Sequence, residues 1–148
     1  MNMGLKIDVI YDIGAFRGEW SNFLSRTSLK NKNFYLFEAN KENEKYLEKL
    51  SFKFFFGVLS DKNKDVNFYS RISTGDSYLV EQTSFYKENI KSVIKKTITL
   101  DEIVKKKNLP FPDFIKIDTQ GSELDILKGS QKSISECSLI YLECPIIE

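Results

Sequence analysis

Several apolar runs of this sequence end at an acidic residue, at the position where a strand would end. These runs end at Asp12, Glu38, Asp118 and Glu143, and a further run ends at Ser60-Asp61. If the runs are parallel strands of an open α/β sheet, their carboxyl ends meet at the edge where such folds bind ligands. A single acid in this place usually caps a helix or a turn. Four of them at one edge predict a ligand site.

The segment after the first apolar run, YDIGAFRG at 11–18, combines an acid with two glycines four residues apart. A dinucleotide-binding loop needs G-x-G-x-x-G, so that backbone amides meet a diphosphate. The spacing here differs, and Asp12 would repel a diphosphate. No lysine is expected nearby to compensate Asp12, which leaves Arg17 as the only candidate. A P-loop is excluded because the sequence has no G-K-[ST].

S-adenosylmethionine suits this segment better, because it carries a sulfonium, an ammonium and a carboxylate but no phosphate. Gly14 would let the backbone approach such a ligand closely, and Asp12 could accept from its ammonium, directly or through water. Amides near Phe16 to Gly18 could meet its carboxylate. Glu38 could accept from both ribose hydroxyls, although dinucleotide folds use an acid in the same way. Gly14→Val is expected to abolish binding by filling the ligand's space.

The elements that would position these residues alternate between strands and helices. Core strands are predicted at 6–13, 33–37, 53–59, 113–117 and 138–142, and helices at 19–28, 41–50, 101–107 and 122–129. This order predicts parallel strands joined by right-handed crossovers. Helical spacing places Trp20, Phe23 and Leu24 on one face of the first helix, and Leu124 and Leu127 on the inner face of the last.

The middle of the chain has a different pattern. Short strands are predicted at 65–70 and 94–100, and Thr99 with Glu102 matches a capping box that opens the following helix. Residues 71–89 are predicted to form a long loop with a short helix near Phe85, as in binding loops and lids. The nearby aromatic residues could stack on a sugar ring or a lipid, although local packing explains them as well; they are Tyr69, Tyr78, Phe85 and Tyr86.

Composition limits the chemistry that the chain can perform. The 148 residues fit one domain, 1–148, and a net charge of +1 gives no indication of a nucleic-acid partner. The chain has no histidine, and its cysteines are Cys137 and Cys144, so we expect no histidine base and no metal site. No export signal and no apolar run of membrane-spanning length is evident. These features predict a soluble, cytoplasmic protein.

The motifs together resemble the FkbM-type family of S-adenosylmethionine-dependent methyltransferases. The resemblance runs from about Val9 to Glu143 and rests on YDIGAFRG (11–18), YLFEAN (35–40), VLSD (58–61), TLDEI (99–103), FIKIDTQGSELDILKG (114–129) and IYLE (140–143). The most specific part is K-I-D-x-x-G-x-E-x-x-x-L-K-G. Two departures are Gln120, where the family often has glutamate, and the missing part that normally follows the fifth strand, so we expect a truncated fold.

The resemblance implies a Rossmann-like, doubly wound and mostly parallel sheet of the class I methyltransferase type. It implies S-adenosylmethionine as the donor and a hydroxyl oxygen of a small molecule, sugar or glycan as the acceptor. The implied donor contacts are Asp12, Gly14, Ala15, Phe16, Gly18 and Ala39, with the ribose at Glu38 and the adenine near Leu59 and Ser60. Asp118 would lie beside the methyl-transfer centre.

A hydroxyl acceptor has to lose its proton, and without histidine a carboxylate must take it if any side chain does. Asp118 is the first candidate and Glu143 the second, while Glu123 is expected to face a helix N-terminus. Lys116 is expected to make a buried polar contact. Two alternatives stay open, a truncated, non-catalytic module of the same fold and, with less support, a NAD-type oxidoreductase domain.

Overall fold

The computed structural model of the chain describes residues 4–70 and 91–143. The predicted loop at 71–89, its helix near Phe85, and the residues Tyr78, Tyr86 and Cys144 lie outside the described residues. The strands of the main sheet are β1 (Val9–Ile13), β2 (Asn33–Glu38), β3 (Lys53–Phe56), β7 (Phe114–Ile117) and β8 (Leu139–Leu142). A second sheet contains β4 (Val58–Leu59), β5 (Asp65–Ser70) and β6 (Lys91–Ile98).

The main sheet has the strand order β3-β2-β1-β7-β8, and every neighbouring pair is parallel. The chain builds outward from β1 through β2 to β3, and it later adds β7 and β8 on the other side of β1. The strand order therefore reverses between β1 and β7, and ligands of open α/β sheets bind at this switch point. The predicted doubly wound, mostly parallel α/β fold is confirmed.

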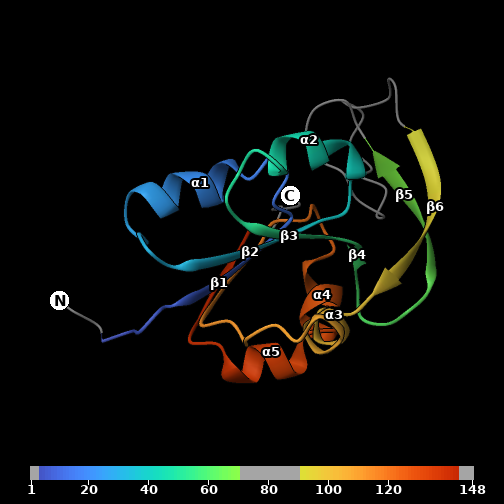
Figure 1. Cartoon of the computed structure of the whole chain (residues 1–148). Helices are drawn as coiled ribbons and strands as arrows, with labels where there is room; N and C mark the ends of the chain where they lie inside the picture. The colour runs from blue at the N-terminus through green and yellow to red at the C-terminus, as the bar shows by residue number, and fades with distance from the viewer. Residues whose placement is uncertain (1–3, 71–90, 144–148) are drawn as a thin grey trace, which may run out of the picture.

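Helices cover both faces of the main sheet (Figure 1). On one face lie α1 (Glu19–Arg26), the 3-10 turn η1 (Lys41–Asn43) and α2 (Glu44–Leu47), and on the other lie α3 (Leu100–Lys107), α4 (Glu123–Lys128) and α5 (Gln131–Glu136). Side chains of β1 alternate between the two layers: Ile10 packs with Leu36 and Leu47, while Tyr11 packs with Ile103. No helix in the described part of the chain is long and apolar enough to cross a membrane.

The predicted start of α3 is confirmed, but the predicted burial of two helix residues is wrong. The capping box before α3 is confirmed, because Thr99 Oγ1 accepts from the Glu102 amide and the Glu102 carboxylate accepts from the Thr99 amide. The predicted burial of Phe23 and Leu124 is wrong, since their side chains are 66% and 69% exposed. Successive helical residues lie about 100° apart, so a face centred on Trp20, Ser21 and Leu24 turns Phe23 outward.

The predicted third strand, 53–59, is broken at Gly57. Residues before it pair with β2, whereas Val58 and Leu59 pair in parallel with β6. A glycine inside a strand often marks such a bend, and here it transfers the chain from one sheet to the other. The antiparallel pair β5 and β6 extends beyond the main sheet (Figure 1), and Lys95 of β6 donates to the Ala39 carbonyl at 2.7 Å.

Candidate functional site

The glycine loop after β1 is fixed by backbone contacts to the end of β2. The amides of Gly14 and Ala15 both donate to the Phe37 carbonyl, at 3.0 and 3.1 Å, and the Gly18 amide donates to Ala15 at 2.7 Å. Gly14 and Gly18 have φ of 74°, and Phe16 has φ of 51°. This left-handed backbone favours glycine. The two glycines of the segment therefore stand at positions where the loop needs them, while Phe16 adopts the same conformation with a side chain.

Gly14 is required by a neighbouring backbone segment. A Cβ atom at position 14 would lie 1.9 Å from the Asp118 carbonyl oxygen, which belongs to the loop after β7. The expected reason for the failure of Gly14→Val is therefore wrong, because the added side chain would collide with the protein itself. Gly18 is also a packing position, since a Cβ there would lie 2.4 Å from Leu50 Cδ1.

A buried ion pair joins β1 to β7 beneath this loop. The Asp12 side chain is fully buried, its Oδ2 accepts from Ser21 Oγ at 2.7 Å, and Lys116 Nζ lies 3.0 Å from its Oδ1. The expectation that no lysine compensates Asp12 is wrong, because the register of β1 and β7 places Lys116 directly opposite Asp12. Arg17 instead lies over the ring of Tyr46, at 4.4 Å. Because Lys116 compensates the charge of Asp12, this residue no longer provides an argument against a diphosphate ligand.

Lys116 extends the pair to two further groups at the switch point. Its Nζ donates to the Gly14 carbonyl at 3.2 Å and lies 3.4 Å from Asp118 Oδ2. The expected buried polar contact of Lys116 is confirmed. A contact between Asp12 and a donor stays a prediction, and in this structure it would have to run through Lys116 or Ser21.

The loop after β7 begins with Asp118, whose side chain is partly exposed. Gln120, whose φ is 55°, donates from Nε2 to Asp118 Oδ1 at 3.3 Å, so both carboxylate oxygens of Asp118 have partners. The loop is braced by Glu123, whose Oε1 accepts from the amides of Thr119 and Gly121 at 3.2 and 2.9 Å. This bracing role of Glu123 went unrecognised in the sequence, where its only signal was an acid at a helix start.

Glu38 ends β2 and accepts from two backbone amides. Its Oε2 accepts from Phe16 at 2.7 Å and its Oε1 accepts from Asn40 at 2.7 Å. The side chain is buried apart from 6% of its surface. Each carboxylate oxygen can accept more than one hydrogen bond, so the ribose contact predicted for Glu38 is compatible with these bonds.

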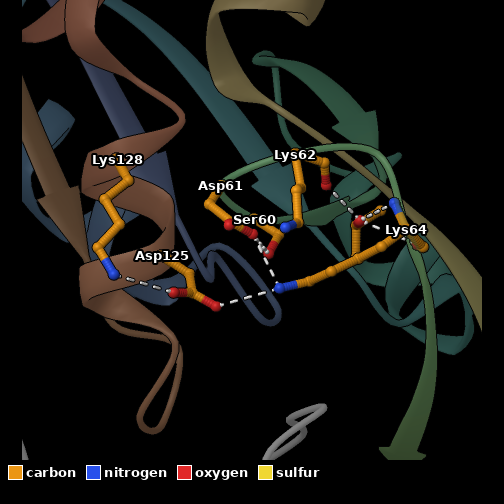
Figure 2. Close-up of polar contacts among 7 residues, drawn as sticks. Ser60, Asp61, Lys62, Lys64, Asp125 and Lys128 are labelled. Atoms are coloured by element: carbon orange, nitrogen blue, oxygen red, sulfur yellow. Dashed lines mark hydrogen bonds and ion pairs between the residues drawn. The ribbon is translucent and has the colours of Figure 1, made fainter.

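The loop after β4 is tied to α4 (Figure 2). Lys64 Nζ lies 2.8 Å from Asp61 Oδ1 and 3.4 Å from Asp125 Oδ2, so one ammonium bridges the loop and the helix. The hydrogen bond to Lys64 lowers the pKa of Asp61, and the same bond raises the pKa of Lys64. Ser60 is fully buried beneath this network, and a Cβ atom on Gly129 would lie 2.1 Å from its carbonyl oxygen.

The structure thus separates the predicted site residues by exposure. Gly14, Phe16, Ala39 and Asp118 are half-buried around the switch point and can meet a ligand. The other predicted donor contacts are buried, namely Asp12, Ala15, Gly18, Glu38, Leu59 and Ser60. Glu143 is exposed after β8, and its amide donates to the Ile117 carbonyl at 3.0 Å, next to Asp118. Adenine packing at Leu59 and Ser60 stays a prediction.

A match to a protein-family model identifies the kind of domain that this chain forms. The model described as the methyltransferase FkbM domain matches residues 12–146, which is most of the chain and includes the candidate site residues from Asp12 to Glu143. The chain belongs to the FkbM methyltransferase family. The resemblance drawn from the sequence motifs is therefore confirmed.

Two known proteins are similar to this FkbM domain. Hexuronic acid methyltransferase AglP of Haloferax volcanii is 27% identical over 143 residues, covering 92% of this chain and 55% of the relative. The crystal structure of methyltransferase FkbM from Methylobacillus flagellatus matches with a TM-score of 0.56 and 22% identity, covering 92% of this chain and 33% of that one. The structural match shows a shared fold. The chain spans about half the length of the curated relative.

Proposed function

We propose that this FkbM domain transfers a methyl group from S-adenosylmethionine to a hydroxyl oxygen of a small-molecule, sugar or glycan acceptor. The observation that carries the proposal is the Gly14 loop held against the Asp118 loop at the switch point of a methyltransferase-family sheet. Both loops follow strands that meet at the switch point, where ligands of open α/β sheets bind.

The charges at the switch point fit this donor. Asp12, Lys116 and Asp118 form a group of two carboxylates and one ammonium, which has a net negative charge. Such a group attracts a cationic sulfonium ligand. Within the proposal, Glu38 accepts from the ribose, and Gly14, Phe16 and Ala39 line the donor.

When bound, the donor supplies a methyl carbon activated by its sulfonium, and the electron pair of the breaking C–S bond stays on sulfur. The chain has to orient the acceptor oxygen in line with that bond and exclude water. The acceptor hydroxyl forms the new C–O bond and gives up its proton. Within the proposal, Asp118 receives that proton, since its side chain is 28% exposed, and Glu143 is the second candidate.

The acceptor class follows from the relative and from the site chemistry together. AglP is by name a hexuronic acid methyltransferase, and a carboxylate such as Asp118 readily accepts a hydrogen bond from a sugar hydroxyl. We therefore place hydroxylated sugars first among acceptors of this domain.

Methyl-labelled S-adenosylmethionine tests the proposal with three acceptors, a hexuronic acid glycoside, a neutral hexose glycoside and glycerol. We expect label in a sugar product, and Asp118→Ala should lower the rate at least about 100-fold, the lower range of general-base contributions. Glu136→Ala is the matched control and should retain most activity, because Glu136 is an exposed glutamate on α5 outside the site. Full activity of Asp118→Ala would overturn its role. Donor binding without transfer to any acceptor would favour the non-catalytic module.

A further inference from the structure

Lys116 occupies an unusual position for a lysine, in the middle of a central strand. Its side chain is only 6% exposed, and its ammonium lies within 3.4 Å of Asp12, Gly14 and Asp118. The ring of Trp20, from α1, lies 5.7 Å away. One buried cation therefore touches β1, the glycine loop and the loop that bears the candidate catalytic carboxylate.

Burial of a charge is costly unless the charge is paired and hydrogen-bonded. Lys116 meets this condition through its contacts to two carboxylates and one carbonyl. Asp12 is fully buried and needs the ammonium as its counter-ion, while the side chain of Asp118 is partly exposed. The single positive charge is thus shared, and one negative charge stays uncompensated on the side of Asp118.

We propose that Lys116 is a positioning residue that orients Asp118 and sets the net charge of the methyl-transfer centre to one negative charge. This inference rests on the proposed function. S-adenosylmethionine has a net positive charge from its sulfonium, ammonium and carboxylate, whereas S-adenosylhomocysteine has none. The uncompensated charge therefore shifts the ratio of the two affinities toward the donor. Outside the group of Asp12, Lys116 and Asp118, the nearby positive charges are Arg17 and Lys95, and the nearby negative charges are Glu38, Glu123 and Glu143. These charges are the same in every variant compared below, so they do not change the expected direction of the shift.

Calorimetric titration with S-adenosylmethionine and S-adenosylhomocysteine tests this inference through the ratio of the two affinities. Lys116→Met removes one positive charge and should raise the preference for the donor at least about threefold, as expected for unit charges a few ångströms apart in a water-like dielectric. Lys116→Arg keeps the charge and should leave the ratio within about twofold. Lys128→Met is the matched control, because Lys128 is 68% exposed on α4.

Asp118→Asn provides a test with the opposite sign and needs no change to the buried ion pair. It should lower the preference for the donor at least about threefold. Ratios unchanged in Asp118→Asn, or in a Lys116→Met protein that unfolds cooperatively, would overturn the inference. Failure of the unmodified protein to bind either ligand would instead overturn the proposed function, so the two failures are distinguishable.

Discussion

Gly14 and Gly4 have nearly the same backbone conformation, with φ of 74° and 68°, but different surroundings. A Cβ atom at Gly4 meets nothing within 4 Å, whereas one at Gly14 meets the Asp118 carbonyl at 1.9 Å. Gly14→Ala should therefore destabilise the protein by about 2–5 kcal/mol, the sum of left-handed strain of about 1–2 kcal/mol and overpacking of about 1–3 kcal/mol. Urea unfolding measures the difference.

Gly4→Ala is the control for this prediction, because it adds the same methyl group at the same φ without a close contact. It should cost about 1–2 kcal/mol or less, since only the backbone strain applies. Equal losses in the two variants would contradict the close approach of Gly14 to Asp118. The comparison also separates folding from ligand binding, which Gly14→Val alone would not do.

Glu38 combines a structural and a proposed ligand role in one carboxylate. Glu38→Ala removes the acceptor of the Phe16 and Asn40 amides as well as the predicted ribose contact. We expect the affinity for S-adenosylhomocysteine to fall by about 1.5–3 kcal/mol, as for hydrogen bonds to a charged group. Glu38→Gln keeps one acceptor oxygen and should lose less. An unchanged affinity in Glu38→Ala, measured by calorimetry, would exclude the ribose role.

At the scale of elements, Gly129 allows the end of α4 to lie close to the loop after β4, because it has no Cβ atom. Its φ of −82° suits any residue, so Gly129→Ala without a contact would stabilise the protein by about 0.4–1 kcal/mol. The Ser60 carbonyl, 2.1 Å from the Cβ position, should reverse the sign, to a loss of about 1–3 kcal/mol. A raised midpoint in urea unfolding would contradict this packing.

The turn between α5 and β8 contains a partly buried thiol. Burial raises the pKa of Cys137, whose Sγ also lies 3.0 Å from the Leu139 carbonyl. Because the folded state holds the thiol proton more tightly, this contribution to stability is present below the ordinary thiol pKa and is lost as the pH rises above it. In a Cys144→Ser protein we expect iodoacetamide to react at pH 8 more slowly than with free cysteine.

Urea provides the control for the thiol measurement, because unfolding exposes Cys137 and should raise the alkylation rate to that of a free thiol. A native rate equal to that of free cysteine would show that burial does not raise this pKa.

Elements were predictable where the pattern was local. Apolar runs located the core strands, and the Thr99–Glu102 spacing located the start of α3. The helix α5 was not predicted, because its segment QKSISE contains one apolar residue and its buried side chain is Ser133. The outward turn of Leu124 has a tertiary cause, since Glu123 must face inward to brace the Asp118 loop.

For the whole molecule, strand order was predictable from the alternation of strands and helices, but contacts across the sheet were not. The pairing of Asp12 with Lys116 depends on the register between β1 and β7, residues more than a hundred apart in the chain. Likewise, the contact of Gly14 with Asp118 depends on two loops that meet only in the fold. The motif K-I-D could be recognised in the sequence, whereas its lysine acquired a role only through geometry.

The central claim is that the switch point between β1 and β7 binds S-adenosylmethionine-type ligands. Titration calorimetry of this chain with S-adenosylhomocysteine, and with NAD as the control, tests it most directly. The account predicts saturable binding of S-adenosylhomocysteine and none of NAD, because the Gly14 loop lacks the dinucleotide spacing. Binding of NAD alone, or of neither ligand, would contradict the account.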